Sequence, residues 1–285
     1  MSPPEVITGA VELRARLAAW RRAGLQIGFV PTMGNLHAGH LELVRAAAAR
    51  TDRVVVSIFV NPLQFGPSED FAAYPRTLEQ DLAELAGEAC DLVFTPDEET
   101  IYPGGRQGTT RIDVPGLSDI LCGISRPGHF SGVATVVAKL FNLVQPELAA
   151  FGEKDRQQLT VIRRMVSDLA FPIEILGVPT RREPDGLAMS SRNRYLDARE
   201  RQVAPALYAA LRAAADALRA GNRDFAALRQ AGMDAIRIAG LAPEYFEILR
   251  QDALAPPQPG DRHLVVLTAA RLGRARLIDN VALDL

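Results

Sequence analysis

The stretch PTMGNLHAGH, residues 31–40, lies where a predicted strand turns into a helix. It follows the apolar run Gln26–Val30 and holds two of the chain's four histidines, three residues apart. Residues 26–32 are predicted to form a strand, and residues 36–50 a helix with its apolar side chains on one face. Gly34 permits the positive φ of a tight turn. The stretch is therefore predicted to join a strand directly to a helix.

Strands and helices alternate along the first 180 residues. Further strands are predicted at residues 53–60, 91–95, 147–151 and 173–178, and further helices at 77–89, 131–144 and 155–169. The run RVVVSIFV, residues 53–60, is apolar almost throughout, which is typical of a parallel strand buried on both faces. The alternation predicts an α/β protein with a doubly wound parallel sheet and right-handed crossovers.

The pattern changes near residue 180. Two consecutive helices are predicted at residues 198–220 and 223–239, and strands joined by short turns at 244–249, 263–268 and 276–279. We expect a first domain spanning residues 1–180 and a smaller α+β domain spanning residues 181–285.

The composition excludes several classes of protein. The 285 residues suffice for a packed core, and a net charge of −2 does not suggest a nucleic-acid partner. No apolar run reaches the roughly 18 residues of a membrane span, and the N-terminus is neither a signal nor a transit peptide. The two cysteines, Cys90 and Cys122, are expected to be reduced thiols in the cytoplasm.

Polar clusters follow the predicted strands. In open α/β sheets ligands bind beyond the carboxyl ends of the strands. The clusters are residues 33–40, 61–64, 152–155 and 181–194, together with RPGHF, residues 126–130, before a helix. We expect them to converge on one crevice.

His37 and His40 are predicted to share a face of the first helical turn. The N–H groups and partial positive charge of a helix N-terminus, with two imidazole donors, suit a phosphate. A lone histidine would more often cap or pack locally, but the pair in this context favours a ligand. A zinc site is disfavoured because no further ligand stands nearby at the right spacing. The sequence contains neither G-x-G-x-x-G after the first strand nor G-x-x-x-x-G-K-[ST].

Six motifs together resemble one family. H-x-G-H after a first strand is the signature of the nucleotidylyltransferase superfamily. PTMGNLHAGH (31–40), FVNPLQF (59–65), YPRT (74–77), RPGHF (126–130), FGEKDRQQL (151–159) and DGLAMSSRN (185–193) resemble the pantothenate synthetase, or pantoate–β-alanine ligase, family. The resemblance implies a Rossmann-like first domain and a C-terminal domain that closes over the active site.

The resemblance also implies an activity. The family condenses pantoate with β-alanine using ATP, through a pantoyl adenylate, and releases AMP, pyrophosphate and pantothenate. ATP is a co-substrate, Mg²⁺ is held mainly by its phosphate oxygens, and the family forms homodimers. No serine or cysteine nucleophile is required.

Site residues are carried over from the matching motifs. The implied catalytic residues are His37, His40, Lys154, Ser190, Ser191 and Arg192. The implied ATP-binding residues are Met33, Gly34, Asn35, Leu36, His37, Ala38, Gly39, His40, Gly152, Glu153, Lys154, Asp155, Arg181, Met189, Ser190, Ser191 and Arg192. The implied substrate-binding residues are Asn61, Gln64, Arg126, His129 and Gln158. Arg182 is interpreted as an exposed, solvated side chain.

Three alternatives remain at this point. A nucleotidylyltransferase that leaves AMP on a phosphorylated product would need cations for a second phosphate, whereas FVNPLQF and DRQQL offer neutral glutamines. An aminoacyl-tRNA synthetase is disfavoured by length and by the lack of a basic face. A nucleotide-sensing module would bind ATP but release no pyrophosphate with pantoate.

Overall fold

The computed structural model describes residues 3–67, 69 and 71–285. The described chain divides into two compact units. The first holds residues 1–153 and 161–179, and the second holds residues 154–160 and 180–285. Each unit is described separately below, and the predicted division at residue 180 stays a prediction.

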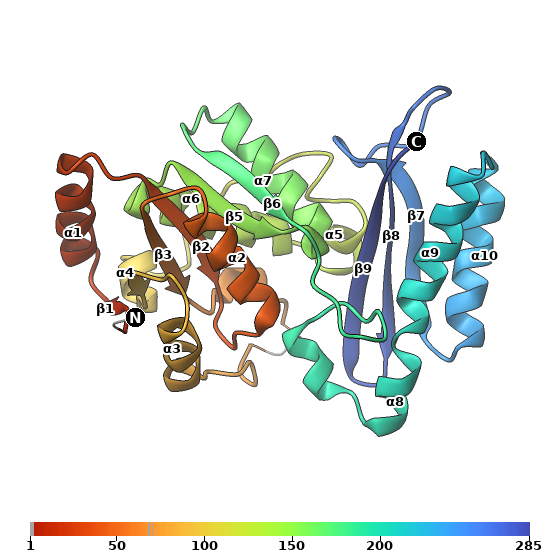
Figure 1. Cartoon of the computed structure of the whole chain (residues 1–285), viewed down its shortest axis with the longest axis horizontal. Helices are drawn as coiled ribbons and strands as arrows, with labels where there is room; N and C mark the ends of the chain where they lie inside the picture. The colour runs from red at the N-terminus through yellow and green to blue at the C-terminus, as the bar shows by residue number, and fades with distance from the viewer. Residues whose placement is uncertain (1–2, 68, 70) are drawn as a thin grey trace. The chain divides into compact units, whose positions relative to one another are not determined.

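The first unit contains a six-stranded, fully parallel sheet (Figure 1). Its strands are β1 (Glu5–Ile7), β2 (Ile27–Thr32), β3 (Arg53–Ile58), β4 (Leu92–Phe94), β5 (Leu148–Gly152) and β6 (Glu174–Val178), in the order β1-β4-β3-β2-β5-β6. The chain moves outward from β2 through β3 to β4 and then returns to β5 on the other side of β2. This reversal makes the β2–β5 neighbourhood the switch point of the sheet, where α/β proteins bind ligands.

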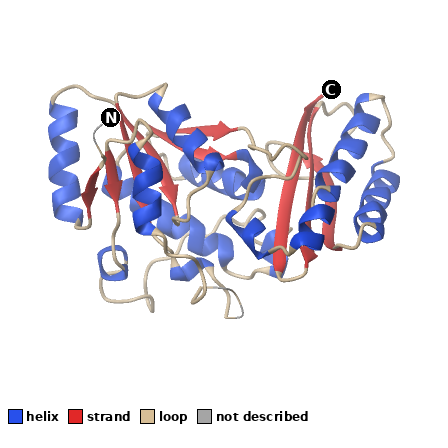
Figure 2. Ribbon diagram, turned by 60° about the horizontal axis from the view of Figure 1, so that its bottom comes forward, coloured by secondary structure: helices blue, strands red, loops and turns tan. Residues whose placement is uncertain are grey.

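Helices cover both faces of this sheet (Figure 2). The helices along this part of the chain are α1 (Ala10–Arg22), α2 (Ala38–Ala48), α3 (Leu78–Ala86), α4 (Glu98–Ile101), α5 (Cys122–Ser125), α6 (His129–Val144) and α7 (Arg156–Asp168). The boundary between the two units falls within α7. Val30 packs in a buried cluster with Val44 of α2. The preceding residue, Phe29, meets Phe141 of α6 edge to face. Because neighbouring residues of a strand point to opposite faces, α2 and α6 lie on opposite faces.

The second unit is built on a three-stranded antiparallel sheet. Its strands are β7 (Ala242–Arg250), β8 (His263–Leu272) and β9 (Ala275–Asp284), and its helices are α8 (Ala198–Val203), α9 (Ala206–Arg219) and α10 (Phe225–Ile238). Leu211 and Leu218 of α9 pack in one buried cluster with Phe246 and Val266 of the sheet. The predicted fold class, a doubly wound parallel sheet with a smaller α+β part, is confirmed.

Several elements differ from prediction, and two of the differences have a clear physical reason. The helix predicted over residues 198–220 is two helices, because Pro205 lies between α8 and α9 and has no N–H to continue the hydrogen-bond ladder. Strand β1 was not predicted, since three residues carry too little alternation to show a period. Among the residues that the structure describes, no helix is long and apolar enough to cross a membrane.

Candidate functional site

The junction between β2 and α2 has the predicted tight turn. Gly34 adopts φ +75° and Asn35 adopts φ +53°, both in the left-handed region. His37 is the N-cap of α2, and its Nδ1 accepts a hydrogen bond from the N–H of Gly39 at 3.1 Å. His40 closes the cap, because its Nδ1 accepts from the N–H of His37 at 3.3 Å. The two histidines thus define where the helix begins.

The hydrogen bonds of His37 and His40 fix their tautomers. A backbone N–H can only donate, so both Nδ1 atoms are acceptors, and a neutral ring then carries its proton on Nε2. The ring centroids lie 4.1 Å apart. The pair therefore carries two Nε2–H donors at the N-terminus of a helix, an arrangement suited to an anion.

Asn61 and Gln64 lie at the carboxyl end of β3, around the 3₁₀ turn Pro62–Gln64. Both are buried. The Gln64 amide donates to the Met33 sulfur at 3.0 Å, and its oxygen accepts from Asn61 at 3.1 Å. Because Met33 belongs to the β2–α2 turn, the structure brings together two segments that the sequence assigned to one site.

Asn61 uses all of its hydrogen-bonding capacity within the protein. Its oxygen accepts from the Leu63 N–H and from the Tyr102 hydroxyl, at 3.2 and 2.7 Å. Its NH₂ donates to Gln64 and to the Gly132 carbonyl, each at 3.1 Å. Four bonds satisfy one carboxamide. In this arrangement Asn61 holds the side chain of Gln64 in place. The predicted contact of Asn61 with substrate stays a prediction.

Gly132 lets helix α6 approach this turn closely. A Cβ at Gly132 would lie 2.3 Å from the Leu63 carbonyl oxygen and 2.7 Å from the Gln64 nitrogen. No other residue fits without moving backbone. The glycine therefore sets the distance between α6 and the turn that carries Gln64.

Arg126, which follows α5, and His129, the first residue of α6, hold the same turn. His129 Nδ1 lies 2.8 Å from the Gln64 carbonyl and Nε2 lies 2.8 Å from Arg126. Since the carbonyl only accepts and the guanidinium only donates, His129 carries its proton on Nδ1, opposite to His37 and His40. These contacts bind Arg126 and His129 to the protein itself, so their predicted role towards substrate stays a prediction.

Arg126 also forms a two-pronged ion pair with Glu69. Its Nε and Nη2 donate to the two carboxylate oxygens at 2.6 and 2.7 Å. Burial raises the pKa of Glu69, but hydrogen bonding and charge from Arg126 oppose it, and the net pKa is lowered. The pair is mostly shielded from solvent.

The predicted segment after β5 emerges at the switch point. Strand β5 pairs with β2, with Phe29 opposite Ala149, and the strand ends at Gly152. Because parallel strands end at the same sheet edge, Gly152 and Glu153 leave the sheet on the edge where the β2–α2 turn lies. A 3₁₀ turn, Glu153–Asp155, then leads into α7, which carries Gln158.

Lys154 and Ser190 line one small recess of the second unit. Leu187, Ala188, Asn193, Leu207, Leu277, Ile278 and Asp279 complete its lining. The carbonyl of Lys154 accepts from the Asn280 side chain at 3.0 Å. Ser190 caps the 3₁₀ turn Ser191–Tyr195 by accepting from the Arg192 N–H at 3.3 Å. The structure therefore brings together Lys154 and the predicted serine loop.

The interpretation of Arg182 as an exposed side chain is wrong. Its guanidinium donates to both carboxylate oxygens of Asp279, at 2.7 and 2.9 Å, and lies 3.6 Å from the centre of the Tyr208 ring. Burial raises the pKa of Asp279, against the effect of Arg182. Arg181, by contrast, is exposed, and its carbonyl accepts from the Met189 N–H at 3.0 Å. The sequence could not show the ion pair of Arg182 because its partner, Asp279, is 97 residues away in the chain.

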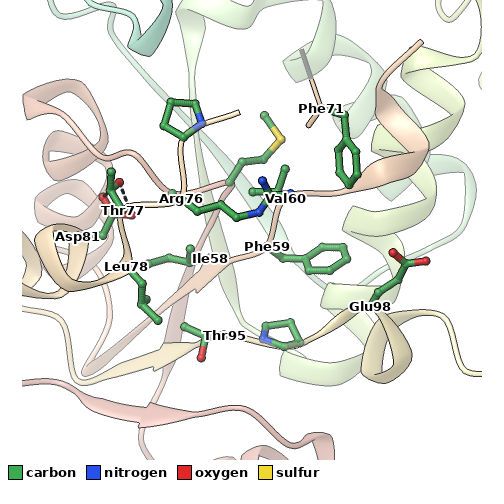
Figure 3. A pocket seen from close by; sticks show the side chains of 14 residues that line it. Ile58, Phe59, Val60, Phe71, Arg76, Thr77, Leu78, Asp81, Thr95 and Glu98 are labelled. Carbon is green, nitrogen blue, oxygen red and sulfur yellow. Dashed lines mark hydrogen bonds between the residues drawn. The ribbon is translucent and has the colours of Figure 1, made fainter. Parts of the chain in front are cut away.

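A cavity of about 370 Å³ lies beside the β2–α2 turn. Its lining includes Met33 and Gly34 of the turn, residues 58–60 at the carboxyl end of β3, and Arg76, Thr77 and Asp81 (Figure 3). Asp81 was not predicted as a site residue. It is 1% exposed, and its carboxylate accepts the N–H groups of Asn35 and Leu36 at 2.9 and 2.7 Å. The only signal in the sequence is its place four residues after the YPRT motif.

The comparisons with known proteins agree with this geometry. The sequence matches the family described as pantoate-beta-alanine ligase over residues 5–282. The chain belongs to the pantoate-beta-alanine ligase family. This membership makes it a carbon–nitrogen ligase that uses ATP as co-substrate.

Relatives in this family cover nearly the whole chain. The pantothenate synthetase of Thioalkalivibrio sulfidiphilus is 61% identical over 279 residues, covering 96% of this chain and 98% of the relative. That of Pseudomonas aeruginosa PAO1 is 59% identical over 96% of this chain and 97% of the relative.

Two solved structures of the family are also similar. The pantothenate synthetase of Thermus thermophilus has a TM-score of 0.91 and 48% identity, covering 97% of this chain and 98% of that one. The pantoate-beta-alanine ligase of Francisella tularensis, solved with beta-gamma ATP and beta-alanine, has a TM-score of 0.81 and 35% identity, covering 98% of this chain and 97% of that one.

Proposed function

We propose that the β2–α2 turn and its histidine pair are where this chain adenylates pantoate, before β-alanine displaces AMP to give pantothenate. The observation that carries the proposal is the N-terminus of α2, where the rings of His37 and His40 lie side by side at the switch point of a parallel sheet. Family membership supports the substrates, and the geometry at the start of α2 supports a role in binding phosphate.

The first step joins pantoate to AMP. A carboxylate oxygen of pantoate attacks the α-phosphorus of ATP, the bond to the bridging oxygen breaks, and pyrophosphate leaves. Negative charge develops on the α-phosphate and on the leaving group, so donors fixed around them lower the barrier. The Nε2–H groups of His37 and His40 would be two such donors. Met33, Gly34, Asn35, Leu36, Ala38 and Gly39 would line the same nucleotide site.

The second step forms the amide. The β-alanine amine attacks the acyl carbon of pantoyl adenylate, the carbon–oxygen bond to AMP breaks, and the nitrogen loses a proton. AMP is already a good leaving group, so holding the amine close to the acyl carbon contributes most. Gln64 and Gln158 would hold pantoate, with Asn61, Arg126 and His129 keeping Gln64 in place.

The remaining predicted residues are proposed to bind ATP. Phosphates would accept hydrogen bonds from the compact ammonium of Lys154, the planar guanidinium of Arg192 and the hydroxyls of Ser190 and Ser191. Asp155 would hold the ribose, and Gly152, Glu153, Met189 and Arg181 would complete the nucleotide contacts. Lys154 and Ser190 line one recess, which supports a shared role.

Mg²⁺ would enter with the nucleotide as part of the substrate. The described residues contain no group of three His, Cys, Asp or Glu side chains that could hold a metal ion. Mg²⁺ keeps several waters and commonly binds through substrate phosphates. Because Mg²⁺ commonly binds in this way, we propose that it arrives as MgATP. By the same family resemblance, we propose a homodimer that works in the cytoplasm.

The test is pantoate-dependent exchange of labelled pyrophosphate into ATP without β-alanine. We expect exchange with pantoate alone, followed by AMP and pantothenate when β-alanine is added. A folded, ATP-binding protein that exchanges nothing would contradict the pantoate assignment, and other acids would then be screened.

A further inference from the structure

The turn between β2 and α2 has a strained backbone. Gly34 and Asn35 both have positive φ, at +75° and +53°. A non-glycine residue such as Asn35 persists in that region only where its surroundings hold it. Successive N–H groups in such a turn can converge on an anion.

The anion in this turn is the protein's own carboxylate, Asp81 of α3. Oδ2 accepts from the Asn35 N–H at 2.9 Å, and Oδ1 accepts from the Leu36 N–H at 2.7 Å. The Thr77 hydroxyl donates to the same carboxylate at 3.2 and 3.3 Å, as Figure 3 shows. A Cβ on Gly34 would come within 2.9 Å of Oδ2. The carboxylate and the turn therefore fit each other tightly.

The contact between Asp81 and the β2–α2 turn is buried. Asp81 is 1% exposed and Asn35 is 3% exposed. A buried carboxylate is unfavourable unless hydrogen bonds satisfy it, and here two backbone N–H groups and a hydroxyl do so. Leu36, whose N–H is held, directly precedes His37, the N-cap of α2. The position of the histidine pair is thus tied to the side chain of Asp81, which lies 45 residues beyond Leu36 in the chain.

We propose that Asp81 is a positioning residue for adenylation. It touches no substrate in this scheme, but it holds the strained turn and so places His37 and His40 for the α-phosphate. The inference rests on the proposed function. It predicts a selective effect, because the first step needs the histidines in place, whereas the second depends on bringing the amine close to the acyl group.

The main variant is Asp81→Asn, which keeps the shape but replaces one acceptor oxygen by an NH₂ that faces a backbone N–H. We expect the maximal rate of pantoate-dependent pyrophosphate exchange to fall roughly 100-fold, the scale of an ångström-sized misplacement. The second step is measured by forming the enzyme-bound adenylate with ATP and pantoate and then mixing it with β-alanine in a rapid quench. Its rate should stay within about threefold of the wild type.

The matched control is Glu147→Gln. Glu147 also accepts a backbone N–H, that of Ile27 at 2.7 Å, but at the opposite end of the same strand β2. Both steps should stay within about threefold of the wild type in this variant. The comparison separates the general effect of losing a carboxylate–backbone hydrogen bond from the effect of losing the bonds that Asp81 makes to the β2–α2 turn.

A second pair of variants applies if Asp81→Asn does not fold. Thr77→Val keeps the side-chain shape and removes only the hydroxyl that restrains Asp81. We expect exchange to fall about threefold to tenfold, in line with one lost hydrogen bond of ordinary net strength. Thr77→Ser should restore it, because serine returns the hydroxyl.

The outcomes separate this inference from the function on which it rests. If the wild type is active and Asp81→Asn exchanges pyrophosphate equally fast, the role of Asp81 alone is overturned. The same holds if Asp81→Asn slows both steps by the same factor. Unchanged exchange in Thr77→Val would do the same where Asp81→Asn is unfolded. Folded wild type that binds ATP but exchanges nothing with pantoate overturns the proposed function and this inference with it.

Discussion

The ring centroids of His37 and His40 lie 4.1 Å apart, and each ring accepts a hydrogen bond from a backbone N–H through Nδ1. The pair is therefore part of the helix cap as well as a candidate for catalysis. The two roles use different ring nitrogens: capping uses Nδ1 as an acceptor, and the proton on Nε2 is the donor proposed for catalysis. Substitutions that keep one nitrogen and lose the other can separate the two roles.

His40→Ala should lose adenylation by a few orders of magnitude, because a donor directed at phosphate disappears. His40→Asn offers a comparison, since its amide can still bond locally near the cap. Both variants are expected to remain folded, as checked by circular dichroism, and both should fail in pyrophosphate exchange. Near-normal exchange by either variant would remove His40 from the chemistry.

The fold was predictable because its signals are local. Periodicity indicated strands β2 to β6 and most helices, and the H-x-G-H motif placed the histidines at a strand end. The unpredicted contacts are long-range ones. Asp81 resembles any acidic residue of an amphipathic helix until the fold brings it against Leu36. The four hydrogen bonds of Asn61 likewise depend on Tyr102, which only the folded chain brings close.

Lys154→Ala should weaken ATP binding and slow adenylation, because the variant removes an ammonium proposed to meet phosphate. The matched control is Lys139→Ala, which removes the chain's only other lysine. Lys139 lies 5.6 Å from the centre of the Tyr102 ring and has no assigned role towards ATP. The apparent KM for ATP in the exchange assay is the measurement. Unchanged ATP kinetics in Lys154→Ala would contradict the assignment.

Gln158→Ala should act chiefly on pantoate, because Gln158 is assigned to pantoate's oxygens. We expect a higher KM for pantoate and little change in the KM for ATP. Gln157→Ala is the neighbouring control, since that buried glutamine has no assigned substrate role. An effect of Gln158→Ala confined to ATP would show that the two substrates have been assigned to the wrong residues.

Gly132→Ala should destabilise the protein, because its methyl group would lie 2.3 Å from the Leu63 carbonyl oxygen. Forcing a carbon atom into packed backbone typically costs about 1–3 kcal/mol. Gly87→Ala is the control, because its Cβ would lie 3.6 Å from the nearest such atom. Thermal unfolding measures both variants, and a stable Gly132→Ala protein would contradict the close contact of α6 with this turn.

The ion pair between Glu69 and Arg126 should make stability depend on pH in a defined direction. The folded state lowers the pKa of Glu69 below its usual value of 4.5, net of an opposing effect of burial. A lowered carboxyl pKa stabilises the folded state fully above the unfolded pKa, and this stabilisation is lost as pH falls through the folded pKa. Glu69→Gln should therefore unfold at a lower temperature than the wild type at pH 7.

The difference between the two proteins should shrink below pH 4.5 and vanish once Glu69 is protonated in the folded wild type. Scanning calorimetry from pH 7 to about pH 3 measures this difference directly, because other carboxyl groups titrate equally in both proteins. Glu12→Gln, which removes the same charge at an exposed position of α1, is the control. A difference between wild type and Glu69→Gln that persists unchanged at the acidic end would mean that the carboxylate charge does not hold Arg126.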